Sequence, residues 1–192
     1  MLEAIKHLDR QVLLAVNHLR SSGLDAAMIL ASERLAWIPA YVLLVGWLIY
    51  HFRRRALLLL PLVLTAVGLA DSITSRLFKP FFARPRPCHD AAIFTQLYLP
   101  NGCGGQFGFL SSHAANSMAL AVFLTLVLPP RRFLALRIGV FAWAILLSYS
   151  RVYLGAHYPT DVIGGASIGA LLGAIAAVAY RHWAPRWWPA ST

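Results

Sequence analysis

Long apolar runs recur along this chain, separated by short basic segments. Five of these runs approach the ~20 residues that an α-helix needs to cross a bilayer. They cover residues 26–50, 56–78, 112–128, 133–150 and 160–180. Only 12% of the 192 residues are charged, whereas a soluble domain carries about a quarter. The pattern predicts an all-α, polytopic membrane helical bundle in which residues 1–192 form a single integral-membrane domain.

The amino-terminal segment, residues 4–20, is amphipathic. Leu8 and Val12 recur at helical spacing, and charged residues such as Asp9 lie between them. The segment is too polar to cross a bilayer, so it predicts a helix lying in the membrane interface and a total of five to six helices. An ordinary amphipathic helix packed on the bundle is the alternative.

Basic connectors indicate how the chain is oriented. Three basic groups lie between or after the apolar runs, and they are Arg53–Arg55, Arg131–Arg132 and Arg181 with Arg186. With five spans, all three groups fall on one side of the membrane, which the positive-inside rule makes cytoplasmic. The loop over residues 79–111 and the connector over residues 151–159 then face outward. Membrane orientation and binding of an anionic lipid explain the formal charge of +10, so no nucleic-acid partner is expected.

Cys88 and Cys103 are the only cysteines of the chain, and both lie in the expected outer loop. Outside the cytoplasm such a pair can form a disulfide, which would close about 15 residues and contribute roughly 3 kcal/mol. Gly102, Gly104 and Gly105 make the second end of the loop flexible enough to meet the first. We expect the disulfide rather than a free pair.

Polar residues stand at the outer borders of the apolar runs. His157 precedes Pro159, which suits the first position of a helix, so Asp161 falls in the first turn of that helix. Asp161 can accept the Nδ1 proton of His157, leave Nε2 free to attack, and stabilise positive charge on the ring. A helix cap beside an interfacial histidine is the alternative.

Ser111, Ser112 and His113 begin another apolar run. Two hydroxyls at a helix start normally mean an N-cap. The same helix end directs unpaired N–H groups and a positive dipole at an anion, so the cap and a phosphate site can coincide. His113 is placed to protonate a leaving oxygen.

Lys79, Arg84, Arg86 and Arg151 are basic residues on the expected outer side, against the charge rule. Guanidinium groups form forked hydrogen bonds to phosphate oxygens, and a lysine adds a compact charge. The convergence of three such stretches predicts a phosphate-binding site. Arg84 alone fits a snorkelling basic rim well.

Together these stretches resemble the three-part signature of the type 2 phosphatidic acid phosphatase superfamily. The motif K-x6-R-P begins at Lys79, and the motif S-R-x5-H-x3-D begins at Ser150. The middle motif, P-S-G-H, departs from the pattern, because Leu110 replaces the proline and Ser112 replaces the glycine. The resemblance covers about residues 75–165.

This resemblance implies a helical bundle that hydrolyses a membrane lipid phosphate without a metal or another cofactor. It implies that His157 attacks phosphorus to form a phosphohistidine, that Asp161 orients His157, and that His113 protonates the leaving group and then activates water. The residues implied to hold the phosphate are Lys79, Arg86, Ser111, Ser112 and Arg151. Members of the superfamily usually have six spans, one more than the runs counted here.

Within the superfamily, the small size and outward site resemble undecaprenyl pyrophosphate phosphatases of the bacterial cytoplasmic membrane, which implies a polyprenyl diphosphate substrate. A phosphatidylglycerophosphate, phosphatidic acid or lipid A phosphatase is the alternative, because the motifs bind phosphate rather than the lipid tail. From a different class, Asp71 and Arg76 in the second run fit a transporter or channel. A metal hydrolase using His89, His113 and His157 lacks a recognisable ligand motif.

Overall fold

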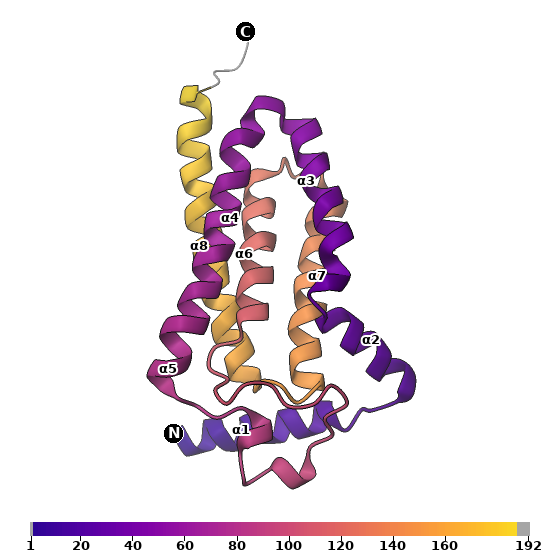
Figure 1. The fold of residues 1–192 in the computed structure, drawn as a ribbon. Coiled ribbons are helices and arrows are strands. Elements are labelled where there is room, and N and C mark those ends of the chain that lie inside the picture. The colour runs from indigo at the N-terminus through magenta and orange to yellow at the C-terminus, as the bar shows by residue number, and fades with distance from the viewer. Residues whose placement is uncertain (1, 188–192) are drawn as a thin grey trace.

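The computed structural model describes residues 2–187, which form an elongated bundle of helices (Figure 1). The α-helices are α1 (Leu2–Asn17), α2 (Ser22–Ser32), α3 (Ile38–Phe52), α4 (Ala56–Ser72), α5 (Lys79–Phe82), α6 (Ser112–Val127), α7 (Leu134–Tyr153) and α8 (Pro159–Trp187). A π-helical segment, η3 (Ile73–Phe78), joins α4 to α5. Because the described residues form helices and no strand, the all-α prediction is confirmed.

Local sequence signals explain where several helices begin. The Oγ of Ser21 accepts a hydrogen bond from the N–H of Leu24 and caps α2. Ser111 caps α6 in the same way, through the N–H of Ala114. Pro159 begins α8, where its missing N–H costs no helical hydrogen bond. The starts of α6 and α8 therefore fall where the sequence predicts them.

Helix α6 lies in the middle of the bundle and packs against α4, α7 and α8 (Figure 1). Its contact with α8 is so close that a Cβ added at Gly169 would lie 2.0 Å from the carbonyl oxygen of Ala115. Small residues at one helix face allow this approach in membrane proteins. At the start of both helices, the N–H of Ser111 donates to the carbonyl oxygen of Asp161 at 2.9 Å. The packing thus sets the first turn of α6 beside the first turn of α8.

Three helical segments of the described chain are long and apolar enough to cross a membrane. They are Leu35–Phe82, Leu134–Tyr153 and Pro159–Ala184. The first contains both α3 and α4, which double back at Arg53–Arg55 (Figure 1). The four predicted spans after the first correspond to α4, α6, α7 and α8.

The prediction of one continuous span over residues 26–50 is wrong. The chain forms α2 and α3 instead, and the two helices meet at an angle (Figure 1). The break falls at Glu33 and Arg34, two adjacent charges that are costly in hydrocarbon. Pro39 follows in the first turn of α3, where proline is favoured. The break leaves Arg34 between the two α-helices, exposed and at the wall of a cavity that also contacts His113.

Helix α1 lies across the end of the bundle (Figure 1). Leu13 and Asn17 are buried, and Asn17 Nδ2 donates hydrogen bonds of 2.7 Å to the carbonyl oxygens of Tyr98 and Tyr153. Leu8, on another face of the helix, remains 59% exposed. The separate amphipathic helix is therefore confirmed, and one face of it packs on the bundle.

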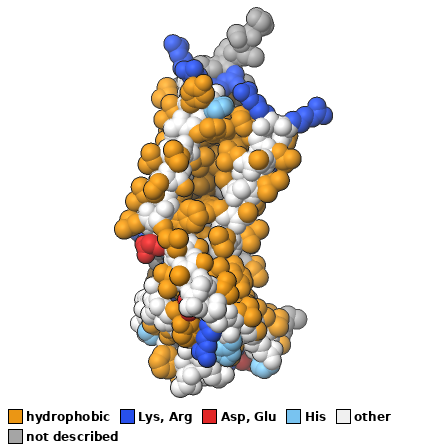
Figure 2. Space-filling model, turned by 90° about the vertical axis from the view of Figure 1, so that its right-hand side faces the viewer, with side chains coloured by type: hydrophobic (Ala, Val, Ile, Leu, Met, Phe, Trp, Pro, Cys, Tyr) orange, Lys and Arg blue, Asp and Glu red, His pale blue; other side chains and the backbone are white. Residues whose placement is uncertain are grey.

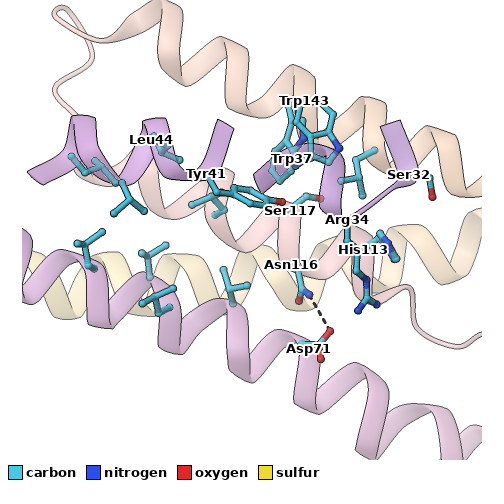
Figure 3. Close-up of a pocket in the computed structure, with 18 residues that line it drawn as sticks. Ser32, Arg34, Trp37, Tyr41, Leu44, Asp71, His113, Asn116, Ser117 and Trp143 are labelled. Atoms are coloured by element: carbon cyan, nitrogen blue, oxygen red, sulfur yellow. Dashed lines mark hydrogen bonds between the residues drawn. The ribbon is translucent and has the colours of Figure 1, made fainter. Parts of the chain in front are cut away.

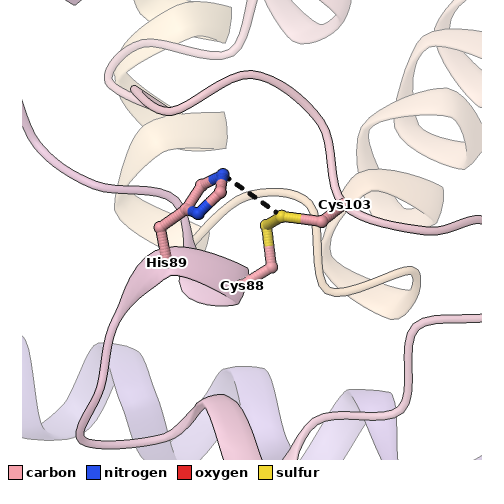
Figure 4. Close-up of side chains that lie close together, drawn as sticks. All are labelled: Cys88, His89 and Cys103. Carbon is pink, nitrogen blue, oxygen red and sulfur yellow. Dashed lines mark hydrogen bonds between the residues drawn. A yellow bond between two sulfur atoms is a disulfide. The ribbon is translucent and has the colours of Figure 1, made fainter.

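The loop over residues 83–111 lies beside α1 at the same end. A disulfide joins Cys88 to Cys103, as expected (Figure 4). His89 Nε2 lies 3.3 Å from Cys103 Sγ. Because the two sulfurs are bonded to each other, neither offers His89 a thiolate with which to bind a metal.

The basic connectors lie at the opposite end of the bundle. Arg53–Arg55 form the turn between α3 and α4, and Arg131–Arg132 lie in the connection between α6 and α7, away from α1 (Figure 1). Figure 2 shows hydrophobic side chains over the middle of one face, with Lys and Arg side chains at this end. Arg181 lies in the last part of α8, whereas the side chain of Arg186 falls outside the described residues. The grouping at one end agrees with the predicted span pattern.

Candidate active site

The predicted site residues meet at the end of the bundle that α1 covers. They occupy separate elements: Lys79 in α5, Arg86 in the following loop, Ser111 to His113 at the start of α6, Arg151 at the end of α7, His157 in the next connector and Asp161 in α8. The close packing of α6 on α8 brings two of these elements together. The loop over residues 83–111 folds back under the bundle and brings Arg86 to within 3.4 Å of His157.

His157 is 1% exposed, and its two ring nitrogens face different partners. Nε2 lies 3.4 Å from Arg86 Nη1, whereas Nδ1 lies 3.7 Å from Asp161 Oδ2. Burial holds the pKa of His157 well below its ordinary value, and the charges of Arg86 and Arg151 lower it further. The ring is therefore neutral near pH 7, the form that has a nitrogen lone pair for attack.

Asp161 is completely buried, and both of its oxygens are bound. Oδ1 accepts a hydrogen bond of 2.7 Å from Arg84, and Oδ2 accepts one of 3.0 Å from the N–H of Tyr158. The 3.7 Å separation from His157 exceeds a hydrogen bond, so the expected Nδ1 contact is not formed in this structure. Such contacts are often long without substrate and tighten when it binds. Asp161 thus caps α8 and also places a carboxylate beside the ring.

Arg84 is part of this site, and its interpretation as a snorkelling rim residue is wrong. Its guanidinium pairs with Asp9 at 2.6 Å and with Asp161 at 2.7 Å. Asp9 is 3% exposed and was absent from the sequence-predicted site. The spacing of the sequence could have indicated its burial, because Asp9, Leu13 and Asn17 are four residues apart and share the buried face of α1.

Ser112 links α6 to the first basic stretch. Its Oγ accepts hydrogen bonds from Thr74 Oγ1 at 2.9 Å and from Lys79 Nζ at 3.2 Å. Thr74 is fully buried in η3, so the π-helical segment, Lys79 and α6 are tied together. The serine that replaces the expected glycine therefore acts as a partner of the lysine.

Arg151 reaches from α7 toward α2, where its guanidinium donates to the buried Ser32 hydroxyl. Its Nε is buried and has no hydrogen-bond partner within the described part of the chain. A buried donor without a partner is unfavourable, so this N–H suits an oxygen that a ligand supplies. Lys79, Arg86 and Arg151 together offer such a ligand a cationic surface.

A cavity of about 580 Å³ begins beside His113 and extends between α3, α4, α6 and α7 (Figure 3). Most of its wall is apolar or aromatic, and the polar residues that line it are Ser32, Arg34, Asp71, His113, Asn116 and Ser117. Asn116 Nδ2 donates to Asp71 Oδ1 at 3.0 Å. Asn116 Oδ1 is buried and lacks a partner among residues 2–187. The cavity can hold a hydrocarbon chain with a polar group at its His113 end.

This chain resembles several known proteins in sequence. Residues 56–185 match the PAP2 superfamily. A lipid A 4'-phosphatase of Bacteroides thetaiotaomicron is 36% identical over 172 residues, and the match covers 88% of this chain and 75% of that protein. The undecaprenyl-diphosphatase BcrC of Bacillus subtilis is 24% identical, with coverage of 80% and 73%.

The fold of this chain also resembles the folds of solved structures. The PAP2-type phosphatidylglycerolphosphate phosphatase of Bacillus subtilis superposes with a TM-score of 0.68 at 25% identity, covering 98% of this chain and 90% of that one. Its likeness spans the whole bundle, including the helices that carry the polar stretches. The chain therefore belongs to the PAP2 superfamily and is a multi-pass bacterial membrane protein with the phosphatase activity of that family.

Proposed function

We propose that this lipid phosphatase acts through a phosphohistidine formed on His157. The observation that supports the proposal most directly is the buried, neutral ring of His157, whose Nε2 lies 3.4 Å from Arg86. Lys79 and Arg151 are close enough for their charges to act on the same ring. A phosphate held by these cations would present its phosphorus atom to Nε2.

The reaction then proceeds in two displacements. Nε2 of His157 forms a bond to phosphorus while the bond to the leaving oxygen breaks, and His113 gives that oxygen a proton. His113 next accepts a proton from water, which attacks phosphorus, breaks the N–P bond and releases inorganic phosphate. The surrounding cations stabilise charge on the phosphate oxygens. This scheme uses no metal ion.

For the substrate, we propose a phosphorylated glycolipid of the lipid A kind. The relative that is 36% identical is a lipid A 4'-phosphatase. Asp71 and the unpartnered oxygen of Asn116 line the cavity next to His113, on the side where the leaving group must lie. These acceptors suit the O–H and N–H donors of an acylated sugar. The apolar remainder of the cavity suits its hydrocarbon chain.

A polyprenyl diphosphate, the substrate implied by the sequence resemblance, is the second candidate. Arg34 favours it, because this guanidinium lies at the same end of the cavity as His113 (Figure 3). A leaving phosphate carries negative charge that Arg34 would stabilise, whereas a sugar hydroxyl does not. Arg34→Ala should therefore slow the release of inorganic phosphate from a diphosphate substrate more than its release from a monoester substrate.

The deciding experiment measures inorganic phosphate released by the purified protein from lipid A, undecaprenyl diphosphate and phosphatidylglycerophosphate. We expect the fastest turnover with lipid A, no turnover by His157→Ala, and full activity with a chelator present. Asp71→Asn should slow lipid A hydrolysis and spare a small aryl phosphate. Faster turnover of the polyprenyl diphosphate would select the second candidate. Release from none of the three lipids by folded protein would overturn both substrate candidates.

We also propose that the site faces outward from the bacterial cytoplasmic membrane. The basic connectors lie at the end of the bundle opposite α1 and the candidate site. The positive-inside rule assigns such an end to the cytoplasm. A disulfide in the loop of the other end is compatible with an oxidising compartment.

A further inference from the structure

Helix α1 supplies a buried carboxylate to the network that holds Asp161. Oδ1 of Asp9 accepts the backbone N–H of Thr160 at 2.9 Å, and Oδ2 accepts the hydroxyl of Thr160 at 2.5 Å and Nη2 of Arg84 at 2.6 Å. These contacts hold the Asp9 side chain in one orientation. Asp9 lies outside residues 56–185, the part of the chain that matches the superfamily.

Arg84 connects Asp9 to Asp161. Its Nη1 lies 2.7 Å from Asp161 Oδ1 and 2.7 Å from Thr160 Oγ1, while Nη2 faces Asp9. Its Cζ also lies 4.2 Å from the centre of the Tyr158 ring. A planar guanidinium bound along two edges and over one face is fixed in place. The position of Asp161 Oδ1 therefore depends on Asp9 as well as on Arg84.

The second oxygen of Asp161 faces the reacting ring. Oδ2 lies 3.7 Å from His157 Nδ1. As the N–P bond forms, the ring gains positive charge, and this carboxylate is placed to balance it. If Arg84 had Asp161 as its single anionic partner, it would offset more of the charge that the ring needs. Because Asp9 also pairs with Arg84, the guanidinium neutralises less of the negative charge of Asp161.

Building on the phosphohistidine chemistry above, we propose that Asp9 is a positioning residue for His157 and acts through Arg84 and Asp161. It divides the charge of Arg84 between two carboxylates and keeps Asp161 Oδ2 directed at the ring. The amphipathic helix α1 is then part of the catalytic arrangement, in addition to covering the end of the bundle.

Asp9→Asn is the direct test, because the amide oxygen can still accept the N–H of Thr160 while the ion pair is lost. We expect kcat for a soluble aryl phosphate to fall about 10- to 100-fold, as when other orienting partners are removed, with KM little changed. The matched control is Glu3→Gln, also in α1, whose carboxylate pairs with Lys6 at the exposed surface. This control should keep the kcat of the unmodified protein.

A double-mutant cycle separates positioning from simple anchoring of α1. If Asp9 acts through Arg84, adding Asp9→Asn to Arg84→Gln should cause little further loss of kcat. If Asp9→Asn lowered kcat by the same factor in the presence and in the absence of Arg84, the inference would be overturned. Should Arg84→Gln fail to fold, Arg84→Lys provides the second background, because one ammonium group cannot span both carboxylates as a guanidinium does. Turnover by His157→Ala would overturn the proposed function itself, a result distinct from either outcome of the cycle.

Discussion

Nε2 of His157 lies 3.4 Å from a guanidinium nitrogen of Arg86, within a site that leaves the His157 side chain almost without solvent contact. The lone pair of Nε2 and the positive charge of Arg86 therefore both face the position where a bound phosphate would lie. A phosphate fits this arrangement, because its oxygens can bind Arg86 while its phosphorus faces the ring.

Replacement of His157 tests the nucleophile. His157→Ala should abolish turnover, because the substitution removes the ring nitrogen that attacks phosphorus. A phosphoenzyme trapped with labelled substrate should be acid-labile and alkali-stable, as expected for phosphohistidine. Label recovered on a serine would contradict the assignment.

Replacement of His113 tests the proton donor. The loss caused by His113→Ala should be large for substrates with poor leaving groups, because their leaving oxygen needs a proton as the bond to phosphorus breaks. It should be much smaller for an aryl phosphate with a very good leaving group. Measuring kcat/KM across a series of leaving groups provides the check, and equal losses throughout would argue against the role.

The buried His157 should also make stability depend on pH. Its pKa in the folded protein lies well below the value of about 6.5 expected in the unfolded chain. Between these two values the unfolded chain binds a proton that the folded protein does not, so stability is fully present above pH ~6.5 and declines as pH falls toward the folded-state pKa. Thermal unfolding between about pH 7.5 and about pH 5 should show a steeper decline for the unmodified protein than for His157→Gln. Parallel declines would contradict this prediction.

Close packing of α6 on α8 should be required for both stability and activity. A Cβ at Gly169 would meet the backbone of Ala115, so Gly169→Ala should destabilise the protein by roughly 1–3 kcal/mol and lower phosphate release. Gly68→Ala is the control, because a Cβ there meets nothing within 4 Å and alanine is the better helix former. The unfolding midpoints of the two variants should differ clearly, and similar midpoints would show that the helices can separate without cost.

Topology can be measured in intact cells. With Cys88 and Cys103 replaced by serine, Gln96→Cys would place one thiol in an exposed part of the loop beside α1. A thiol reagent that cannot cross the inner membrane should label this cysteine without cell lysis. Labelling only after the membrane is broken would invert the proposed orientation.

The sequence predicted the parts of the site that depend on local spacing. His157 and Asp161 lie four residues apart around Pro159, and a helix that begins at Pro159 keeps Asp161 close to the residues just before it. The starts of α6 and α8 were likewise predictable from Ser111 and Pro159, since caps act within one turn.

The parts that depend on long-range packing were not predictable in this way. The pairing of Asp9 with Arg84 joins residues 75 positions apart, and it exists only because α1 crosses under the bundle. The break at Glu33 and Arg34 was hidden because apolar residues continue on both sides of the two charges. Their cost in hydrocarbon, rather than the average of the run, decides where α2 ends.

Helix α6 has 16 residues and therefore rises about 24 Å, whereas the hydrocarbon layer of a bilayer is ~30 Å thick. His113 stands in its first turn, so the head group of a substrate must sink toward the hydrocarbon or the bilayer must become thinner around the protein. Either adjustment costs more in a thicker membrane. We therefore expect turnover to depend on the thickness of the surrounding membrane as well as on the residues of the site.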